Sequence, residues 1–428
     1  MSIAAPPLRL RLPALFCYGV FGMPLAMAAL PLYVHLPKFY GDYLGVNLGL
    51  LGGVLLVLRL ADRVVEPVLG AISDRGGARK RALALAAPLL ALGMLALFLP
   101  IPRGEVALLA WLAVSLAVIY FAFSLATINH NAWGAELSSD PVERTRITAV
   151  REGLALTGVV IASVLPGFLG GADEGLARFA MLFAILTLAC AAITLLGTPA
   201  GSRPAAARTT SIRQLIARPL GDSLFRRLLV VFMLNGIAAA IPATLVLFFI
   251  ADVLGAQSQQ GLFLALYFVA GAAGMPLWVR LSARWGKERA WLASMLVAVA
   301  AFVWASRLST GDTGAFAVIC VLSGVALGAD LALPPSMLAD VIGRRGNMDA
   351  TGSYFGVWTL ATKLNLALAA GIALPLLDAL GYHPGSRDES ALRALAIVYA
   401  LVPCALKLGA LAALAWLGRM PLQRTLPD

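Results

Sequence analysis

The stretch FCYGVFGMPLAMAALPLYV, residues 16–34, carries no charged side chain over its whole length. A run of about 20 apolar residues is long enough to cross the ~30 Å hydrocarbon core of a bilayer as one α-helix. Such runs recur along the chain, in which 60% of the residues are hydrophobic and only 13% are charged. A soluble domain is about 25% charged. The sequence therefore predicts an all-α membrane protein.

The apolar runs predict twelve membrane-spanning helices. The segments of roughly ten residues with alternating hydrophobicity that mark a β-barrel are not found in the sequence. The run nearest the N-terminus is predicted to be a retained span rather than a signal peptide, because no soluble domain follows it. The predicted spans are 13–35, 44–71, 82–101, 106–132, 147–170, 176–198, 226–251, 260–281, 290–308, 314–341, 351–378 and 391–418.

Lysine and arginine residues gather in alternate loops, which predicts the orientation of the chain. With the N-terminus in the cytoplasm, the basic clusters 75–81, 203–227 and 280–289 all fall on the cytoplasmic side, where such residues are enriched. The same asymmetry accounts for the net charge of +11, so we expect no nucleic-acid partner. We expect a multi-pass protein of the plasma membrane, or of the inner membrane in a bacterium, with both termini in the cytoplasm.

The chain divides into two halves around its longest polar interval. We predict an N-terminal six-helix bundle at 1–198, a cytoplasmic linker at 199–225 and a C-terminal six-helix bundle at 226–428. The segments PVLGAISDRGG (67–77) and PLWVRLSARWG (276–286) align with proline, arginine and glycine in matching positions. Such a repeat is typical of transporters built from two duplicated bundles. We therefore expect a transporter with a substrate path between its halves.

The predicted span 44–71 contains four charged residues, Arg59, Asp62, Arg63 and Glu66. They are three or four residues apart, so they share one face of a helix. Charged groups at membrane depth face the protein interior or a water-filled cavity and pair with one another. Two interpretations follow: a neutral structural cluster, or a site in which the two carboxylates bind Na⁺ or accept a proton.

The segment GAISDRGGARKR (70–81) resembles the loop signature of the major facilitator superfamily. That resemblance implies the major facilitator fold of twelve helices in two bundles. It also implies a role for three residues: Gly70 would allow close helix contact, while Asp74 and Arg75 would take part in a cytoplasmic latch of ion pairs and helix-end contacts.

Five further stretches resemble the glycoside-pentoside-hexuronide:cation symporters, a family of carbohydrate transporters. The resemblance implies that Asp62, Glu66 and Thr127 form the cation site, with Arg59 and Arg63 as charge partners. Because Arg63 is itself a cation beside this site, it could take the place of the ion. The five stretches, in the order of that family, are RLADRVVEP (59–67), ATINHNAWGAELSSD (126–140), ERTRITAVRE (143–152), MLADV (337–341) and TGSYFGVWTLATKL (351–364).

The same resemblance implies that Trp133, Arg151 and Lys363 contact the solute, although Trp133 could equally be an interfacial anchor. It places His130 where sugar-transporting members carry a carboxylate, and we include His130 in the solute site because a neutral imidazole can donate and accept one hydrogen bond each. A lysine in the middle of the span 351–378 needs a counter-charge, for which Asp330 and the carboxylates of the span 44–71 are candidates. We therefore add Asp330 to the solute site.

One further feature bears on the solute. The position near Met23 or Pro24 lacks the carboxylate that sugar-transporting members of the family carry, so the usual pair of sugar-binding carboxylates is absent.

Lys407, late in the last apolar run, is interpreted as a residue that snorkels to the cytoplasmic edge.

These observations predict a secondary transporter of a small polar organic solute, possibly sugar-like, that works by alternating access as a symporter coupled to Na⁺ or H⁺. The alternative is a transporter of an amphiphile such as a lysolipid, since animal lysolipid transporters resemble the same family. We do not expect an enzyme, because one deep histidine supplies neither a nucleophile with its base nor a metal-binding set. No cofactor beyond the coupling cation is expected, and one chain with both bundles can act as a monomer.

Overall fold

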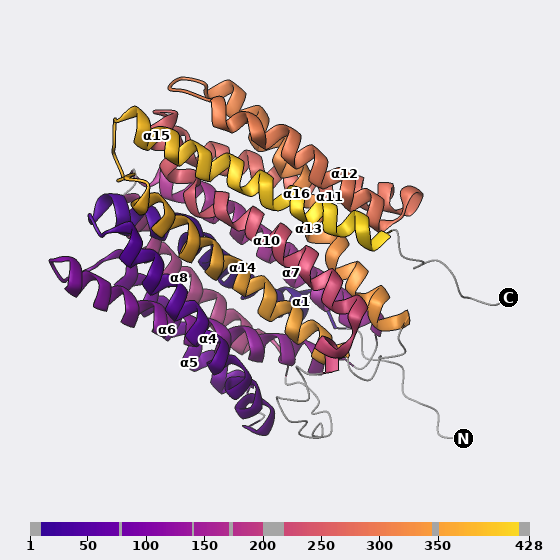
Figure 1. The fold of residues 1–428 in the computed structure, drawn as a ribbon. Coiled ribbons are helices and arrows are strands. Elements are labelled where there is room, and N and C mark those ends of the chain that lie inside the picture. Colours follow the sequence, from indigo (N-terminus) through magenta and orange to yellow (C-terminus); the bar gives the residue numbers. More distant parts are fainter. Residues whose placement is uncertain are drawn as a thin grey trace, which may run out of the picture. The chain divides into compact units, whose positions relative to one another are not determined.

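The computed structural model describes residues 10–76, 79–138, 141–170, 174–199, 218–344 and 351–418. Within these ranges it does not describe the side chains of residues 63–76, 135, 141, 142, 144, 145, 149, 156, 339, 343, 344, 351, 352, 417 and 418. The described chain is almost entirely helical and contains no β-strand. Eleven helical segments of the described part are long and apolar enough to cross a membrane. The 29-residue helix α4 (Leu48–Gly76) occupies the place of the remaining predicted span. The protein is therefore a multi-pass helical membrane protein (Figure 1).

The helices follow the predicted spans closely, with extensions at their ends. The first span is longer than predicted, because it continues from Leu12 to Tyr43 through turns of π-helix. Its parts are α1 (Leu12–Gly19), α2 (Gly22–Leu30), η1 (Pro31–His35), α3 (Leu36–Lys38) and η2 (Phe39–Tyr43). Next come α5 (Arg79–Phe98), α6 (Glu105–Glu136), α7 (Pro141–Phe168) and α8 (Glu174–Gly197). The later helices are α10 (Ser223–Phe248), η3 (Phe249–Val253), η4 (Gln257–Gln259), α11 (Gln260–Trp285), α12 (Lys287–Phe302), η5 (Val303–Arg307), α13 (Thr313–Arg344), α14 (Thr351–Ala379), α15 (Glu389–Ala396), η7 (Ile397–Leu401) and α16 (Val402–Gly418).

Two compact units make up the chain. Unit 1 consists of Met1–Phe39 and Val57–Thr209, and unit 2 consists of Tyr40–Leu56 and Thr210–Asp428. The start of α4 thus belongs to unit 2, where Asn47 Nδ2 donates a hydrogen bond to Asp378 Oδ1 at 2.8 Å. Most of the predicted linker 199–225 lies outside the described residues, so the predicted bundle boundaries stay a prediction.

Glycines allow pairs of helices to approach closely inside each unit. In unit 2, a Cβ added to Gly324 of α13 would lie 2.4 Å from the carbonyl oxygen of Tyr267 on α11. In unit 1, a Cβ on Gly158 of α7 would lie 2.2 Å from the carbonyl oxygen of Met23 on α2. Lipid tails give no hydrophobic driving force between helices, so close backbone packing of this kind holds membrane bundles together. This close packing fixes the helices relative to one another within each unit, and with them the positions of their polar side chains.

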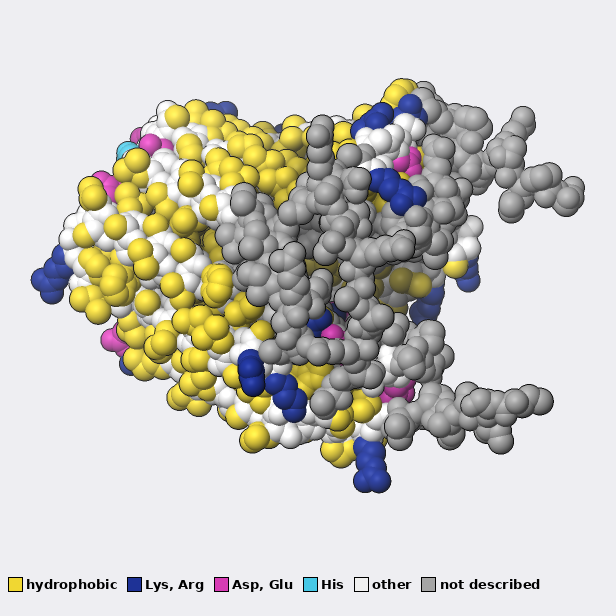
Figure 2. Space-filling model, turned by 90° about the horizontal axis from the view of Figure 1, so that it is seen from below, with side chains coloured by type: hydrophobic (Ala, Val, Ile, Leu, Met, Phe, Trp, Pro, Cys, Tyr) yellow, Lys and Arg dark blue, Asp and Glu magenta, His cyan; other side chains and the backbone are white. Residues whose placement is uncertain are grey.

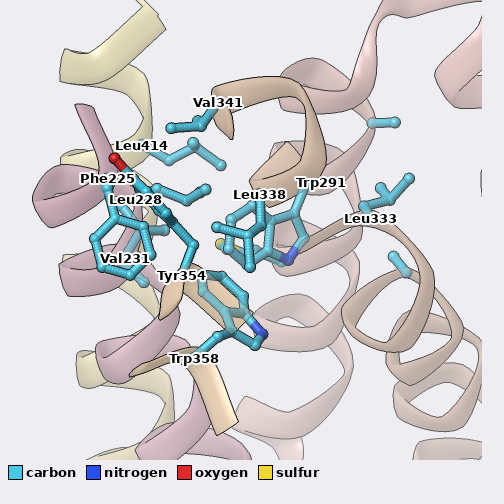
Figure 3. Close-up of a cluster of buried hydrophobic side chains, with 14 of the residues drawn as sticks. Phe225, Leu228, Val231, Trp291, Leu333, Leu338, Val341, Tyr354, Trp358 and Leu414 are labelled. Carbon is cyan, nitrogen blue, oxygen red and sulfur yellow. The ribbon is translucent and has the colours of Figure 1, made fainter. Parts of the chain in front are cut away.

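Aromatic side chains form a packed core at one end of unit 2. Trp291, Tyr354 and Trp358 pack there with Leu338, and the cluster contains apolar residues of six helices (Figure 3). Asp222 begins α10 by accepting hydrogen bonds from the backbone N–H groups of residues 224 and 225, which satisfies two of the otherwise unpaired donors of the helix start. In unit 2, α10 also packs along α14 and α16 (Figure 1).

The described surface is largely apolar, as a bilayer requires. Hydrophobic side chains cover much of the described surface in the space-filling view of Figure 2. Large apolar residues such as Val106 and Phe168 are 81% and 82% exposed. In a soluble protein such exposure would favour aggregation, whereas in a membrane the same side chains contact lipid tails.

Candidate transport site

The polar face of α4 contacts a matching polar face of α6 inside unit 1. Ser124 Oγ lies 3.3 Å from Asp62 Oδ1 and donates a hydrogen bond to it. About one turn away, Arg59 Nε donates to the hydroxyl oxygen of Tyr120 at 3.3 Å. The contacting residues are three or four positions apart on both helices, so successive turns meet. The two described charges of the predicted stripe therefore face protein rather than lipid.

Arg59 is deeply buried and has several partners. Its side chain is 4% exposed, Nη2 donates to the carbonyl oxygen of Leu32 at 3.4 Å, and the guanidinium lies 4.8 Å from the ring centroid of Tyr33. A hydrogen-bonded arginine over an aromatic face is partly compensated for its loss of water. These contacts are with a hydroxyl, a carbonyl and an aromatic ring, so the predicted role of Arg59 as a charge partner stays a prediction.

Thr127 continues the polar face of α6 beyond Ser124. Its Oγ1 is buried and makes no hydrogen bond within the described part of the chain. An unsatisfied buried hydroxyl costs roughly 1–3 kcal/mol, so a hydrogen-bonding partner for this oxygen would be stabilising. The side chains of Glu66 and Arg63, predicted next to it, lie outside the described residues, as do those of the predicted latch residues Gly70, Asp74 and Arg75.

His130 connects α6 to α1. Its side chain is 1% exposed, and its ring stacks on Tyr18 with the ring centroids 4.4 Å apart. Nε2 lies 2.8 Å from the carbonyl oxygen of Tyr18. Because a carbonyl can only accept, Nε2 must donate, so Nδ1 of the neutral ring is the acceptor, and it is buried without a partner among the described residues. The ring is therefore positioned by α1 and has one unused acceptor.

Arg151 of α7 contacts side chains from two directions. Nη1 donates to Asn131 Oδ1 on α6, and Nη2 donates to Glu152 Oε1 at 2.5 Å. Helix α2 approaches from a third direction, because a Cβ added to Gly22 would lie 3.0 Å from Arg151 Cγ. The Arg151 side chain is 19% exposed and that of Glu152 is 61% exposed. Arg151 thus has a fixed position and an accessible guanidinium.

Trp133 lies on α6 and contacts the segment that follows the end of α8. It is 1% exposed, and its Nε1 donates to the carbonyl oxygen of Pro199 at 3.1 Å. Lys80 Nζ lies 5.2 Å from its ring centroid. It also donates to two carbonyls at the end of α8, that of Leu195 in the helix at 3.0 Å and that of Thr198 just after it at 2.9 Å. In this conformation the Trp133 ring packs within unit 1, so a solute would contact it only after a local rearrangement.

Unit 2 contains a closed polar network that includes Asp330. Asp330 Oδ2 lies 3.1 Å from Lys407 Nζ, while Oδ1 accepts from Asn235 Nδ2 at 3.0 Å and from Trp291 Nε1 at 2.8 Å. Lys407 Nζ also donates to Asn235 Oδ1 at 2.6 Å. The expectation that Lys407 snorkels to the cytoplasmic edge is wrong, because its side chain is only 11% exposed and pairs inside the bundle.

The network also bears on Lys363, for which Asp330 was a candidate counter-charge. The contacts of Asp330 join four helices, α10, α12, α13 and α16. Lys363 lies on α14, where its side chain is partly buried. The described partner of Asp330 is therefore Lys407 and not Lys363.

Sequence reasoning missed several residues of these clusters. Tyr120, Ser124 and Asn131 were missed, although they share one helix face with the predicted Thr127. The four residues are spaced four, three and four positions apart, and this spacing is the signal that could have found them. Asn235 gives no such signal, because it is an isolated amide in an apolar helix. In the described part of the chain, no group of three or more His, Cys, Asp or Glu side chains is arranged to hold a metal ion.

Comparison with known proteins adds three findings. A model of the family described as "MFS/sugar transport protein" matches residues 15–424. The sphingosine-1-phosphate transporter MFSD2B of Mus musculus is 22% identical over 422 residues, which cover 89% of this chain and 84% of that protein. The inner membrane symporter YicJ of Escherichia coli (strain K12) is 23% identical over 265 residues, 57% of this chain and 55% of YicJ.

A solved structure has the same fold. The bacterial homologue of the human lysosomal transporter Spinster, in an inward-facing and unoccupied conformation, matches with a TM-score of 0.71 over 97% of this chain and 98% of that chain, at 14% identity. The predicted major facilitator fold is thereby confirmed. Because the family model extends over nearly the whole chain, the protein belongs to the MFS/sugar transport protein family of membrane transporters.

Proposed function

We propose that this transporter is a symporter that couples the movement of a small organic solute to Na⁺ or H⁺. The coupling cation binds at Asp62, Glu66 and Thr127, with Ser124 as a further oxygen donor. One observation carries the proposal: Ser124 contacts Asp62 beside a buried Thr127 hydroxyl that has no described partner. Hydroxyl and carboxylate oxygens are the ligands of hard cations, and a carboxylate is also a proton acceptor.

The solute contacts are proposed at His130, Trp133, Arg151 and Lys363. Of these, Arg151 is supported best, because its guanidinium is both fixed and accessible. Asp330 contributes indirectly, by holding together the helices of unit 2 that contact it. Solute and cation act together in alternating access, in which the protein exchanges between two conformational states. Each ligand shifts the equilibrium between these states only as far as it binds one of them more tightly than the other.

A small polar, sugar-like solute is the first candidate. Its support is the description of the family, which includes sugar transport, and the similarity to the symporter YicJ. The candidate cation site adds to this support, since coupling to an ion gradient is the usual means of concentrating a polar solute.

An amphiphile such as a lysolipid is the second candidate. It is favoured by the position of His130, which packs against Tyr18 and is almost completely buried, and by the apolar Met23 and Pro24 where sugar-transporting members have a carboxylate. The similarity to the mouse sphingosine-1-phosphate transporter, which covers 84% of that protein, agrees with this candidate.

The remaining features of the proposal concern the setting. We place the protein in the plasma membrane with both termini in the cytoplasm, as the distribution of basic residues indicates. It acts as a monomer, carries its solute unchanged and without catalysis, and has no nucleic-acid partner. On the cytoplasmic side, Gly70, Asp74 and Arg75 form the latch, and Arg63 joins Arg59 as a charge partner.

Uptake into proteoliposomes tests the proposal. Labelled sugars and labelled lysolipids are offered with an inward Na⁺ gradient, an inward H⁺ gradient or no gradient, and we expect accumulation only with a gradient. Thr127→Ala should lower the apparent affinity for the cation. Thr187→Ala is the matched control, because Thr187 also has a buried Oγ1 without a described partner but lies on α8. Equal cation dependence in the two variants would contradict the site.

A further inference from the structure

Arg151 and its neighbours form a small site whose chemistry indicates the charge of the solute. The guanidinium is directed by Asn131 from α6, and its stem is confined by the backbone at Gly22 of α2. Helix α1 also packs closely on Arg151, because a Cβ added to Gly19 would lie 3.3 Å from the Arg151 backbone nitrogen. These contacts come from three different helix segments of unit 1. A guanidinium held in this way keeps its planar fork of N–H donors in one orientation.

The contact between Arg151 and Glu152 is of a different kind. One hydrogen bond joins them, from Nη2 to Oε1 at 2.5 Å, and the carboxylate of Glu152 is on a side chain that is 61% exposed. Arg151 is only 19% exposed, but the Glu152 side chain reaches water, which screens its charge and weakens the pair. By contrast, an arginine fork binds a carboxylate or phosphate through two parallel charge-assisted hydrogen bonds, which are stronger. Glu152 is therefore a weak partner that a better-matched anion can replace.

We propose that Arg151 is the anchor for an anionic group of the transported solute, a phosphate or a carboxylate, and that Glu152 is a counter-ion within the chain that this group displaces. The inference rests on the proposed function, because it takes Arg151 as part of the solute site. Before the solute binds, Glu152 neutralises the guanidinium. When the anion binds, it takes the N–H donors of Arg151 and the Glu152 carboxylate turns to water. A neutral solute cannot make this exchange, so the pair selects for charge.

Asn131 has a supporting role in this arrangement. Its Oδ1 accepts a hydrogen bond from Nη1 of Arg151, which directs the fork without contributing charge. We therefore regard Asn131 as a positioning residue. Asn131→Ala should weaken binding of an anion while preserving the preference for anionic over neutral probes, whereas Arg151→Gln should abolish that preference.

Equilibrium binding to the full-length protein in nanodiscs tests the inference, with the shift in unfolding temperature as the measurement. The probes are two pairs that differ in charge, glucuronate with glucose and lysophosphatidic acid with the monoacylglycerol of the same acyl chain, together with inorganic phosphate. We expect the anionic member of at least one pair to stabilise the protein, and which pair responds identifies a polar or an amphiphilic source of the anion. Glu152→Gln should tighten that binding roughly two- to fivefold, since it removes the competing carboxylate.

A matched control exists within unit 1. Glu174 and Arg178 form another pair at 2.6 Å, in which the acid is similarly exposed at 64% and the arginine is more exposed at 56%, so Glu174→Gln makes the same chemical change elsewhere. It should leave binding unchanged. Arg151→Lys keeps the charge but lacks the fork, so it should bind the anion more weakly than the wild type.

Three results would overturn the inference: Glu152→Gln leaving anion binding unchanged or weaker, neutral and anionic probes binding equally well, or no stabilisation by any anionic probe at its highest soluble concentration. These measurements use no ion gradient. The inference and the proposed cation coupling can therefore fail independently of each other.

Discussion

The buried pair of Lys407 and Asp330 allows a quantitative prediction about the stability of unit 2. Lys407→Met removes the cation from a carboxylate that keeps its hydrogen bonds from Asn235 and Trp291, and Asp330→Asn leaves the ammonium with Asn235 Oδ1 as a remaining acceptor. Breaking a buried ion pair by removing one partner destabilises a protein by roughly 3–5 kcal/mol, because the other charge stays buried. The double variant Asp330→Asn with Lys407→Met has no buried charge, and an asparagine oxygen can still accept from Trp291. We expect it to lie within about 1 kcal/mol of the wild type.

Thermal unfolding of the purified protein, followed by tryptophan fluorescence, measures this difference. Each single variant should unfold at a clearly lower temperature, and the double variant should recover most of the loss. Ser323→Ala is the control on the same helix, since Ser323 donates only to backbone carbonyls of its own helix. Single variants as stable as the wild type, or a double variant as destabilised as the two losses added together, would refute the assignment of a structural charge pair. Recovery of stability with loss of transport would show that Asp330 also acts on the solute.

Two further predictions concern packing and a helix end. Gly158→Val should strongly destabilise the protein, because its Cβ would lie 2.2 Å from the carbonyl oxygen of Met23. Gly153→Val on the same helix should be tolerated, because nothing lies within 4 Å of its Cβ. The unfolding temperatures of the two variants measure the difference. Hydrogen bonds from Ser390 and the N–H of residue 391 lower the pKa of Asp388, so its stabilising effect is present above the ordinary aspartate pKa of about 3.9 and is lost as pH falls through the lower folded value. The difference in stability between wild type and Asp388→Ala should therefore be seen at neutral pH and disappear in acid, and a difference that persists in acid would contradict this.

Much of the fold could be predicted from the apolar runs. Length and composition predict a spanning helix well, because the bilayer sets one thickness for every span and requires each helix to satisfy its own backbone hydrogen bonds. The helix ends were less predictable. The first helical segment continues to Tyr43, beyond the predicted end at residue 35, since the polar residues there remain helical through π-turns.

The candidate site was only partly predictable. Arg59 and Asp62 were expected to face protein, since charges in a membrane span require partners, and they do. Their partners Tyr120 and Ser124 were not identified, because the spacing of polar residues shows that they share a helix face but not which helix that face contacts. Which residues of two helices meet depends on their rotation and depth, and these are set by packing across the whole bundle.

Lys407 illustrates the same limit more sharply. A lysine near the end of an apolar span is usually explained by snorkelling, which needs no partner. Its partners Asp330 and Asn235 lie 77 and 172 residues away in sequence. No local pattern connects them, so the prediction failed where a contact between distant helices decides the outcome.

The central claim is that Asp62 couples solute movement to a cation, and Asp62→Asn tests it most directly. Proteoliposomes that contain the wild type or the variant are compared in two assays with the same labelled solute: accumulation driven by a Na⁺ or H⁺ gradient, and exchange of internal for external solute without a gradient. We predict that Asp62→Asn abolishes the gradient-driven accumulation and retains the exchange. Accumulation at the wild-type level by the variant would contradict the claim.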